Sequence, residues 1–228
     1  MTKVLMVLTN TTKFDHLNRA TGVWLSEATH FNEVMAENNI VVDYVSPQGG
    51  YVPLDPGSIG SDEMDDTNWQ FYNDANFRRN ALARSLKPSD VIPSDYAAIY
   101  YAGGHGVMWD FPTSDAVASI AKKIYDNGGV ISAVCHGVVG LLPITNSDGS
   151  KFIAGKKLTG FTNEEEAINK LTDDVPFLAE DSLKAAGAVH TKAPAYTEKI
   201  VVDGRLVTGQ NPQSARGVGE AVLTIIGK

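Results

Sequence analysis

One segment of the chain, Val130–Gly140, places the only cysteine directly after an apolar run. The run Val130–Val134 has the apolar character of a buried strand in a parallel sheet. Ala133 and Gly137 lie two positions before and after Cys135. Small residues at this spacing are typical of a nucleophile elbow, a sharp turn from a strand into a helix. The segment therefore predicts an α/β protein with Cys135 at the tip of such a turn.

Two interpretations of Cys135 follow from this pattern. At the N-terminus of a helix, free backbone N–H groups and the helix dipole favour a thiolate, which is the form needed for nucleophilic catalysis. The alternative is a structural cysteine, because free cysteines are among the most buried residues in proteins. The elbow pattern favours the catalytic interpretation. A lone cysteine also excludes a disulfide within the chain.

Strand-like and helix-like segments alternate along the rest of the chain. A turn at Asp203-Gly204 separates two β-branched runs within residues 199–207, which predicts a β-hairpin near the C-terminus. The alternation predicts a doubly wound, mostly parallel sheet with helices on both faces, a flavodoxin-like architecture. We find no repeat or linker and expect a single domain over residues 1–228. We expect strands at 3–8, 41–45, 97–101 and 130–134, and helices at 21–38, around 117–124, and at 213–226.

Charge and hydropathy exclude several classes of partner. The formal net charge of −8 argues against nucleic acid or an anionic membrane as the main partner. Apolar stretches are too short for a membrane span, and the N-terminal run is too short for a signal peptide. We therefore expect a cytoplasmic protein.

Ligands of open α/β sheets bind beyond the carboxyl ends of the strands. Three segments bring unusual residues to that edge: the one that follows Leu8 and leads to Glu27, the glycine-rich Gly103–Gly106, and the elbow. Glycines allow backbone N–H groups to approach a substrate, so Gly103–Gly106 could form half of an oxyanion hole and the His136 N–H the other half. The alternative for these glycines is a tight strand-to-helix turn.

The chain resembles the ThiJ/PfpI superfamily, which shares its fold with class I glutamine amidotransferases. Within it, the similarity is to the branch that contains glyoxalase III and related heat-shock chaperones. The resemblance covers nearly the whole chain and rests on five blocks in the same order: Thr21–Glu27, Ala102–Asp110, Ala133–Gly137, Thr159–Glu166 and Thr208–Pro212.

The resemblance implies a nucleophile, Cys135, next to His136, with a carboxylate from the fourth block that completes a triad. We assign this carboxylate to Glu166, and Glu27 matches a second acid that lies against the sulfur. Glu164 and Glu165 are interpreted as glutamates of a helix cap, an alternative that also holds for Glu166. Oxyanion and substrate binding are assigned to Gly104, His105, Trp109 and Gly137.

Two departures from the family pattern bear on substrate preference. Val138 stands where the pattern has a proline after Cys-His-Gly, and Phe31 stands where it has a proline after the histidine of the first helix. His16, His30 and His190 lack the spacing of metal ligands, so we expect neither a metal nor a cofactor.

The family implies a glyoxalase that converts methylglyoxal to lactate through a hemithioacetal on Cys135, without glutathione. Protein deglycation consumes the same dicarbonyl and stays open. The alternatives are a holdase chaperone with a redox-sensing Cys135, and a cysteine hydrolase or peptidase. Glutaminases of the related amidotransferases have a histidine and a glutamate close together late in the chain. The late His190 is followed by Thr191-Lys192, which disfavours a glutaminase. We expect a homodimer, with unfolded or glycated proteins as further partners. The acidic segment 62–66 is a solvated loop or a partial lid over Cys135.

Overall fold

The computed structural model describes residues 2–228, which form a central six-stranded sheet in the order β2-β1-β3-β4-β8-β7. All neighbouring strands in this sheet are parallel except the antiparallel pair β7–β8, and a separate parallel pair is formed by β5 and β6. The strands are β1 (Lys3–Val7), β2 (Val41–Val45), β3 (Ala98–Tyr101), β4 (Val130–Val134), β5 (Lys157–Leu158), β6 (Val189–His190), β7 (Ile200–Asp203) and β8 (Leu206–Gly209).

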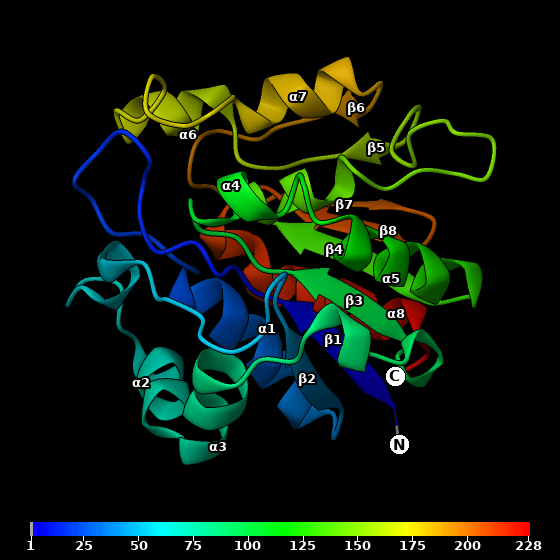
Figure 1. Cartoon of the computed structure of the whole chain (residues 1–228), viewed down its shortest axis with the longest axis horizontal. Coiled ribbons are helices and arrows are strands. Elements are labelled where there is room, and N and C mark those ends of the chain that lie inside the picture. Colours follow the sequence, from blue (N-terminus) through cyan, green and yellow to red (C-terminus); the bar gives the residue numbers. More distant parts are fainter. Residues whose placement is uncertain (1) are drawn as a thin grey trace.

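Helices cover both faces of the sheet. Helices α1 and α8 pack against each other on one face, and α5 packs on β3 and β4. Figure 1 shows α6 and α7 together with β5 and β6 at one side of the molecule, above the sheet in this view. The helices are α1 (Leu25–Glu37), α2 (Asp66–Asn73), α3 (Ala75–Phe77), α4 (Val107–Asp110), α5 (Asp115–Asp126), α6 (Asn163–Ile168), α7 (Ala179–Ala185) and α8 (Ala215–Ile225). The chain also forms the π-helix η2 (Arg78–Ala83). The 3₁₀ helices are η1 (Pro56–Ile59), η3 (Pro88–Asp90), η4 (Pro93–Asp95), η5 (Cys135–Leu141) and η6 (Pro212–Ser214).

The core has two halves because successive side chains of a strand point to opposite faces. In β3, Ile99 and Tyr101 belong to the cluster that contains α5, whereas Ala98 and Tyr100 belong to the cluster that contains α1 and α8. All four side chains are buried. This explains the continuous apolar runs of the central strands, which are typical of parallel strands buried on both faces.

The predicted sheet and C-terminal hairpin are confirmed, and one helix begins later than expected. Residues before Leu25 stay extended because the Val23 N–H donates to the Pro53 carbonyl at 2.9 Å, and the Val23 carbonyl accepts from the Asp55 N–H at 2.9 Å. Gly22 allows this approach: a Cβ there would lie 2.2 Å from the Pro53 oxygen. Within residues 2–228, no helix is long and apolar enough to cross a membrane.

Candidate active site

The predicted elbow is present at the end of β4. Cys135 has φ of 56°, in the left-handed region that non-glycine residues rarely adopt outside functional sites. Gly137 must be small, because a Cβ there would lie 2.3 Å from the backbone oxygen of Tyr101. The helix expected after the strand is the 3₁₀ helix η5, which begins at Cys135 itself. The backbone thus presents Cys135 beyond the carboxyl end of a central strand.

The expectation that a helix N-terminus makes Cys135 a thiolate is wrong for the resting site. Burial raises the pKa of the Cys135 thiol well above its usual range, and the neighbouring Glu27 raises it further. The His136 N–H lowers it without outweighing the other two. The free energy needed to bury a thiolate exceeds the stabilisation that this short helix end provides. The resting group is therefore a thiol that needs a base.

Glu27 lies in the first turn of α1, fully buried beside that thiol. Its Oε2 accepts the Gly103 N–H at 2.6 Å, and the Tyr100 hydroxyl donates to its backbone oxygen at 2.8 Å. Burial raises the pKa of Glu27 to about 8, against smaller lowering contributions from Cys135 and Gly103. Glu27 is therefore protonated at neutral pH and can donate a proton to a thiolate or an alkoxide.

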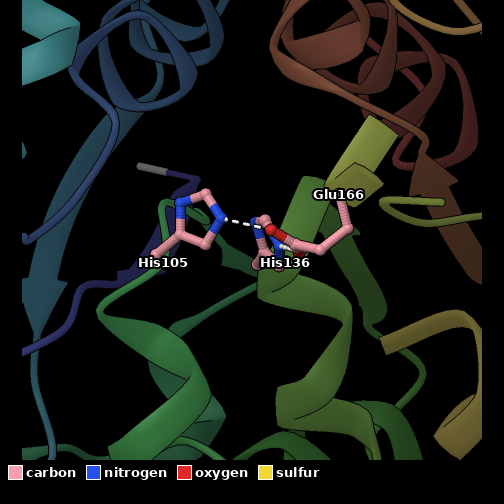
Figure 2. Close-up of side chains that lie close together, drawn as sticks. All are labelled: His105, His136 and Glu166. Atoms are coloured by element: carbon pink, nitrogen blue, oxygen red, sulfur yellow. Dashed lines mark hydrogen bonds and ion pairs between the residues drawn. The ribbon is translucent and has the colours of Figure 1, made fainter. Parts of the chain in front are cut away.

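Glu166 connects two histidines inside the protein. His136 Nε2 lies 2.7 Å from Glu166 Oε2, and His105 Nε2 lies 2.8 Å from Glu166 Oε1. Figure 2 shows both rings turned toward the carboxylate. Burial alone would raise the pKa of Glu166, but the two histidines outweigh it and hold that pKa well below the usual range. Glu166 is accordingly an ionised carboxylate.

The ionised carboxylate fixes one proton on each imidazole. It only accepts hydrogen bonds, so each histidine donates its Nε2–H to Glu166. His136 Nδ1 lies 3.5 Å from Cys135 Sγ, and in the neutral imidazole it is the nitrogen that can accept the thiol proton. Thiol, imidazole and carboxylate form a triad in which His136 takes the thiol proton and Glu166 stabilises the resulting charge.

The neighbouring Glu165 has a different role. Thr162 and Glu165 form a capping box, which agrees with the interpretation of Glu165 as a capping residue, whereas Glu164 is exposed. The buried Glu165 carboxylate accepts five hydrogen bonds, from Thr162 N and Oγ1, Tyr196 N, Gln210 Nε2 and Asn211 Nδ2. These bonds fasten α6, and with it Glu166, to segments far along the chain.

The triad opens into a cavity of about 260 Å³. Of the residues expected from the sequence, Cys135, His136, Glu27, Gly104 and His105 line it. The acidic segment contributes Glu63 to its rim, and other lining residues that sequence reasoning missed are Arg19, Trp24, Phe161 and Tyr196.

Trp109, Gly137 and Glu166 do not line this cavity. Trp109 packs edge-on against Phe14, with ring centroids 5.0 Å apart, and Phe14 in turn lies 5.6 Å from the His105 ring. Trp109 therefore supports the wall behind His105, and its position does not support the expected contact with substrate. Gly137 acts through its lack of a side chain, which permits the elbow.

The same cluster could hold a metal ion. The donor atoms of His105, His136 and Glu166 lie within 4.8 Å of one another, and two imidazoles with one carboxylate suit zinc. In the present arrangement these atoms satisfy one another through hydrogen bonds.

Comparison with known proteins places this site in a family. The model of the DJ-1/PfpI family matches residues 18–225. The chain belongs to the DJ-1/PfpI family. Within the family, it is 33% identical to Glyoxalase 3 of Candida albicans, over 98% of both chains. It is 34% identical to the glutathione-independent glyoxalase HSP31 of Saccharomyces cerevisiae, over 93% of both.

Solved structures of DJ-1/PfpI relatives agree with the fold. Glyoxalase III from Candida albicans superposes with a TM-score of 0.89 at 32% identity, covering 98% of this chain and 97% of that one. Rapid Encystment Protein 24 KDa of Francisella tularensis superposes with a TM-score of 0.95 at 41% identity, covering 99% of both.

Proposed function

We propose that this DJ-1/PfpI protein is a glyoxalase that converts methylglyoxal to lactate without glutathione or another cofactor. The observation that carries the proposal is the position of Cys135, which lies between a protonated carboxyl group and an oriented base at the bottom of a small cavity. The names of the relatives support it, because Glyoxalase 3 and HSP31 are named as glyoxalases.

The reaction begins with addition of sulfur to the aldehyde. His136 Nδ1 takes the proton of the Cys135 thiol, and the sulfur forms a bond to the aldehyde carbon. The carbonyl electron pair moves to oxygen, which takes the proton of Glu27 and gives a hemithioacetal. Gly104 and His136 line the cavity, and their backbone N–H groups are the proposed oxyanion donors.

The second step moves a proton between adjacent carbons. Glu27, now ionised, removes the hydrogen of the former aldehyde carbon and returns it to the ketone carbon, while the hydroxyl proton passes to the second oxygen. The product is a lactoyl thioester. One carbon is oxidised and its neighbour reduced, so the step balances without an external oxidant. Water then cleaves the carbon–sulfur bond and releases lactate.

The direct test is turnover of methylglyoxal by the purified protein with no added thiol. Lactate should form in amounts equal to the methylglyoxal consumed, and Cys135→Ala should abolish the reaction while its circular dichroism spectrum stays that of wild type. Lactate formation by the alanine variant at the wild-type rate would refute the proposal.

We also propose that the protein is a cytoplasmic homodimer and that glycated or unfolded proteins are further partners. Sedimentation equilibrium tests the dimer, and suppression of client aggregation by Cys135→Ala tests whether a chaperone role is separate from turnover.

A further inference from the structure

Activation of the thiol uses only one of the two histidines that Glu166 holds. His136 serves Cys135, whereas His105 lies 61 positions before Glu166 in the sequence and contacts its other oxygen at 2.8 Å. The two rings lie with centroids 4.2 Å apart. His105 is buried, shares the triad carboxylate and lines the substrate cavity. We therefore expect it to have a role separate from that of His136.

The same carboxylate orients both imidazoles in the same way. His105 donates its Nε2–H to Glu166, which leaves Nδ1 as its proton acceptor. Figure 2 shows the second nitrogen of His105 on the side of the ring away from Glu166. The His105 side chain keeps 6% of its surface exposed, against 1% for His136, and His105 lines the cavity.

We propose that His105 Nδ1 is the general base that activates water for hydrolysis of the thioester on Cys135. This inference rests on the proposed glyoxalase function. The water oxygen forms a bond to the thioester carbon, and its proton goes to His105 Nδ1 while His136 gives its proton to the sulfur. The carbon–sulfur bond breaks and the acid is released, and the two imidazoles do not carry an extra proton at the same time. The proton on His105 passes to solvent.

The two groups that act on the sulfur, His136 and Glu27, are less suited to this step. His136 holds the proton that the leaving sulfur needs, so it acts as the acid of the second half-reaction. Glu27 lies against that same sulfur, where an ionised carboxylate would repel the departing thiolate, and its raised pKa of about 8 returns it to the protonated form at neutral pH. One carboxylate thus orients two bases, one for each half of the reaction.

The variant His105→Gln tests this division. The side-chain amide nitrogen of glutamine reaches the place of Nε2 and donates to Glu166 Oε1, but glutamine offers no base in place of Nδ1. We expect steady-state turnover to fall by roughly 10²–10⁴-fold, the usual effect of losing a general base. One equivalent of methylglyoxal should still be consumed, and a lactoyl thioester should accumulate on Cys135.

Hydroxylamine identifies this thioester, because it converts a thioester to a hydroxamate. A hemithioacetal on Cys135 gives no hydroxamate. Alkylation of Cys135 by iodoacetamide should keep its wild-type dependence on pH in His105→Gln. In His136→Gln, alkylation should fall and no thioester should form. His16→Gln, at an exposed histidine, is the matched control and should behave as wild type.

Wild-type turnover by His105→Gln would overturn the inference. Loss of Cys135 alkylation in this variant without accumulation of thioester would also overturn it, because His105 would then only support Glu166. His105→Ala gives an independent measurement: added imidazole should restore hydrolysis in the space left by the ring, and a folded variant that imidazole does not rescue would count against the base. If the wild type itself does not consume methylglyoxal, the proposed function fails and this assignment falls with it, whereas an active wild type with wild-type turnover by His105→Gln overturns the assignment alone.

Discussion

Replacement of Glu27 by glutamine should make the protein more stable at mildly alkaline pH while it removes activity. Glutamine has the shape of a protonated glutamate, so its oxygen can still accept the Gly103 N–H and its amide can face the thiol. What it removes is the ability to lose a proton. Wild-type Glu27 must ionise inside the protein as pH rises, and burial makes that costly.

The size of the effect follows from the pKa of Glu27, which burial raises from 4.5 to about 8. Below pH 4.5, both the folded and the unfolded protein hold the proton. Between pH 4.5 and 8 only the folded protein holds it, so the stability that this proton confers is lost as pH rises. The 3.5-unit difference, 8 minus 4.5, corresponds to about 5 kcal/mol at about 1.4 kcal/mol per unit. The carboxyl group is fully buried, so solvent does not screen this effect.

Urea denaturation of wild type and Glu27→Gln at intervals from pH 5 to 8 measures this effect. The stability difference in favour of the variant should grow by about 4 kcal/mol from pH 5 to pH 8, because 3 of the 3.5 units lie in this interval, at about 1.4 kcal/mol per unit. Turnover of the variant should be lower by roughly 10²–10⁴-fold. Parallel stability curves would show that Glu27 ionises normally in the folded protein, and the account of its proton would be refuted.

Three further changes test the elbow and the triad. Glu166→Gln offers one acceptor to two histidine N–H groups, so one imidazole takes the wrong tautomer and turnover should fall on the order of 10⁴-fold, as is known for triads that lose their carboxylate; full turnover would contradict the triad. Gly137→Ala puts a Cβ 2.3 Å from the Tyr101 oxygen and should lower the free energy of unfolding by about 1–3 kcal/mol, whereas wild-type stability would show that the elbow tolerates a side chain. Peroxide should inactivate the enzyme faster as pH rises, because the thiolate is the reactive form; peptide mass spectrometry should find oxygen added at Cys135, and an unmodified Cys135 would favour a structural cysteine.

Local sequence patterns predicted the parts of the fold that local chemistry determines. The elbow could be predicted because this turn has no room for large side chains near Cys135. The sequence meets this requirement with Ala133 and Gly137. The hairpin was visible because Asp203-Gly204 is a strong turn signal. In contrast, the start of α1 depends on contacts between Val23 and residues 53–55, and no pattern near Val23 shows them.

The site was predicted in part for the same reason. Cys135 and His136 are adjacent, and the family resemblance added Glu27 and Glu166. The contact of His105 with Glu166 joins residues 61 positions apart, and a glycine-rich turn would explain His105 equally well from the sequence. The acceptor role of Glu165 toward Gln210 and Asn211 was invisible, because a capping box accounts for Glu165 from local residues alone.

The central claim is that Cys135 converts a dicarbonyl to a hydroxy acid through a covalent intermediate. The most direct measurement mixes purified protein with methylglyoxal, with no glutathione or other thiol, and follows methylglyoxal loss and lactate formation together. We expect equal amounts of both with wild type and neither with Cys135→Ala. Lactate formation by the alanine variant, or methylglyoxal loss without lactate in the wild type, would contradict it.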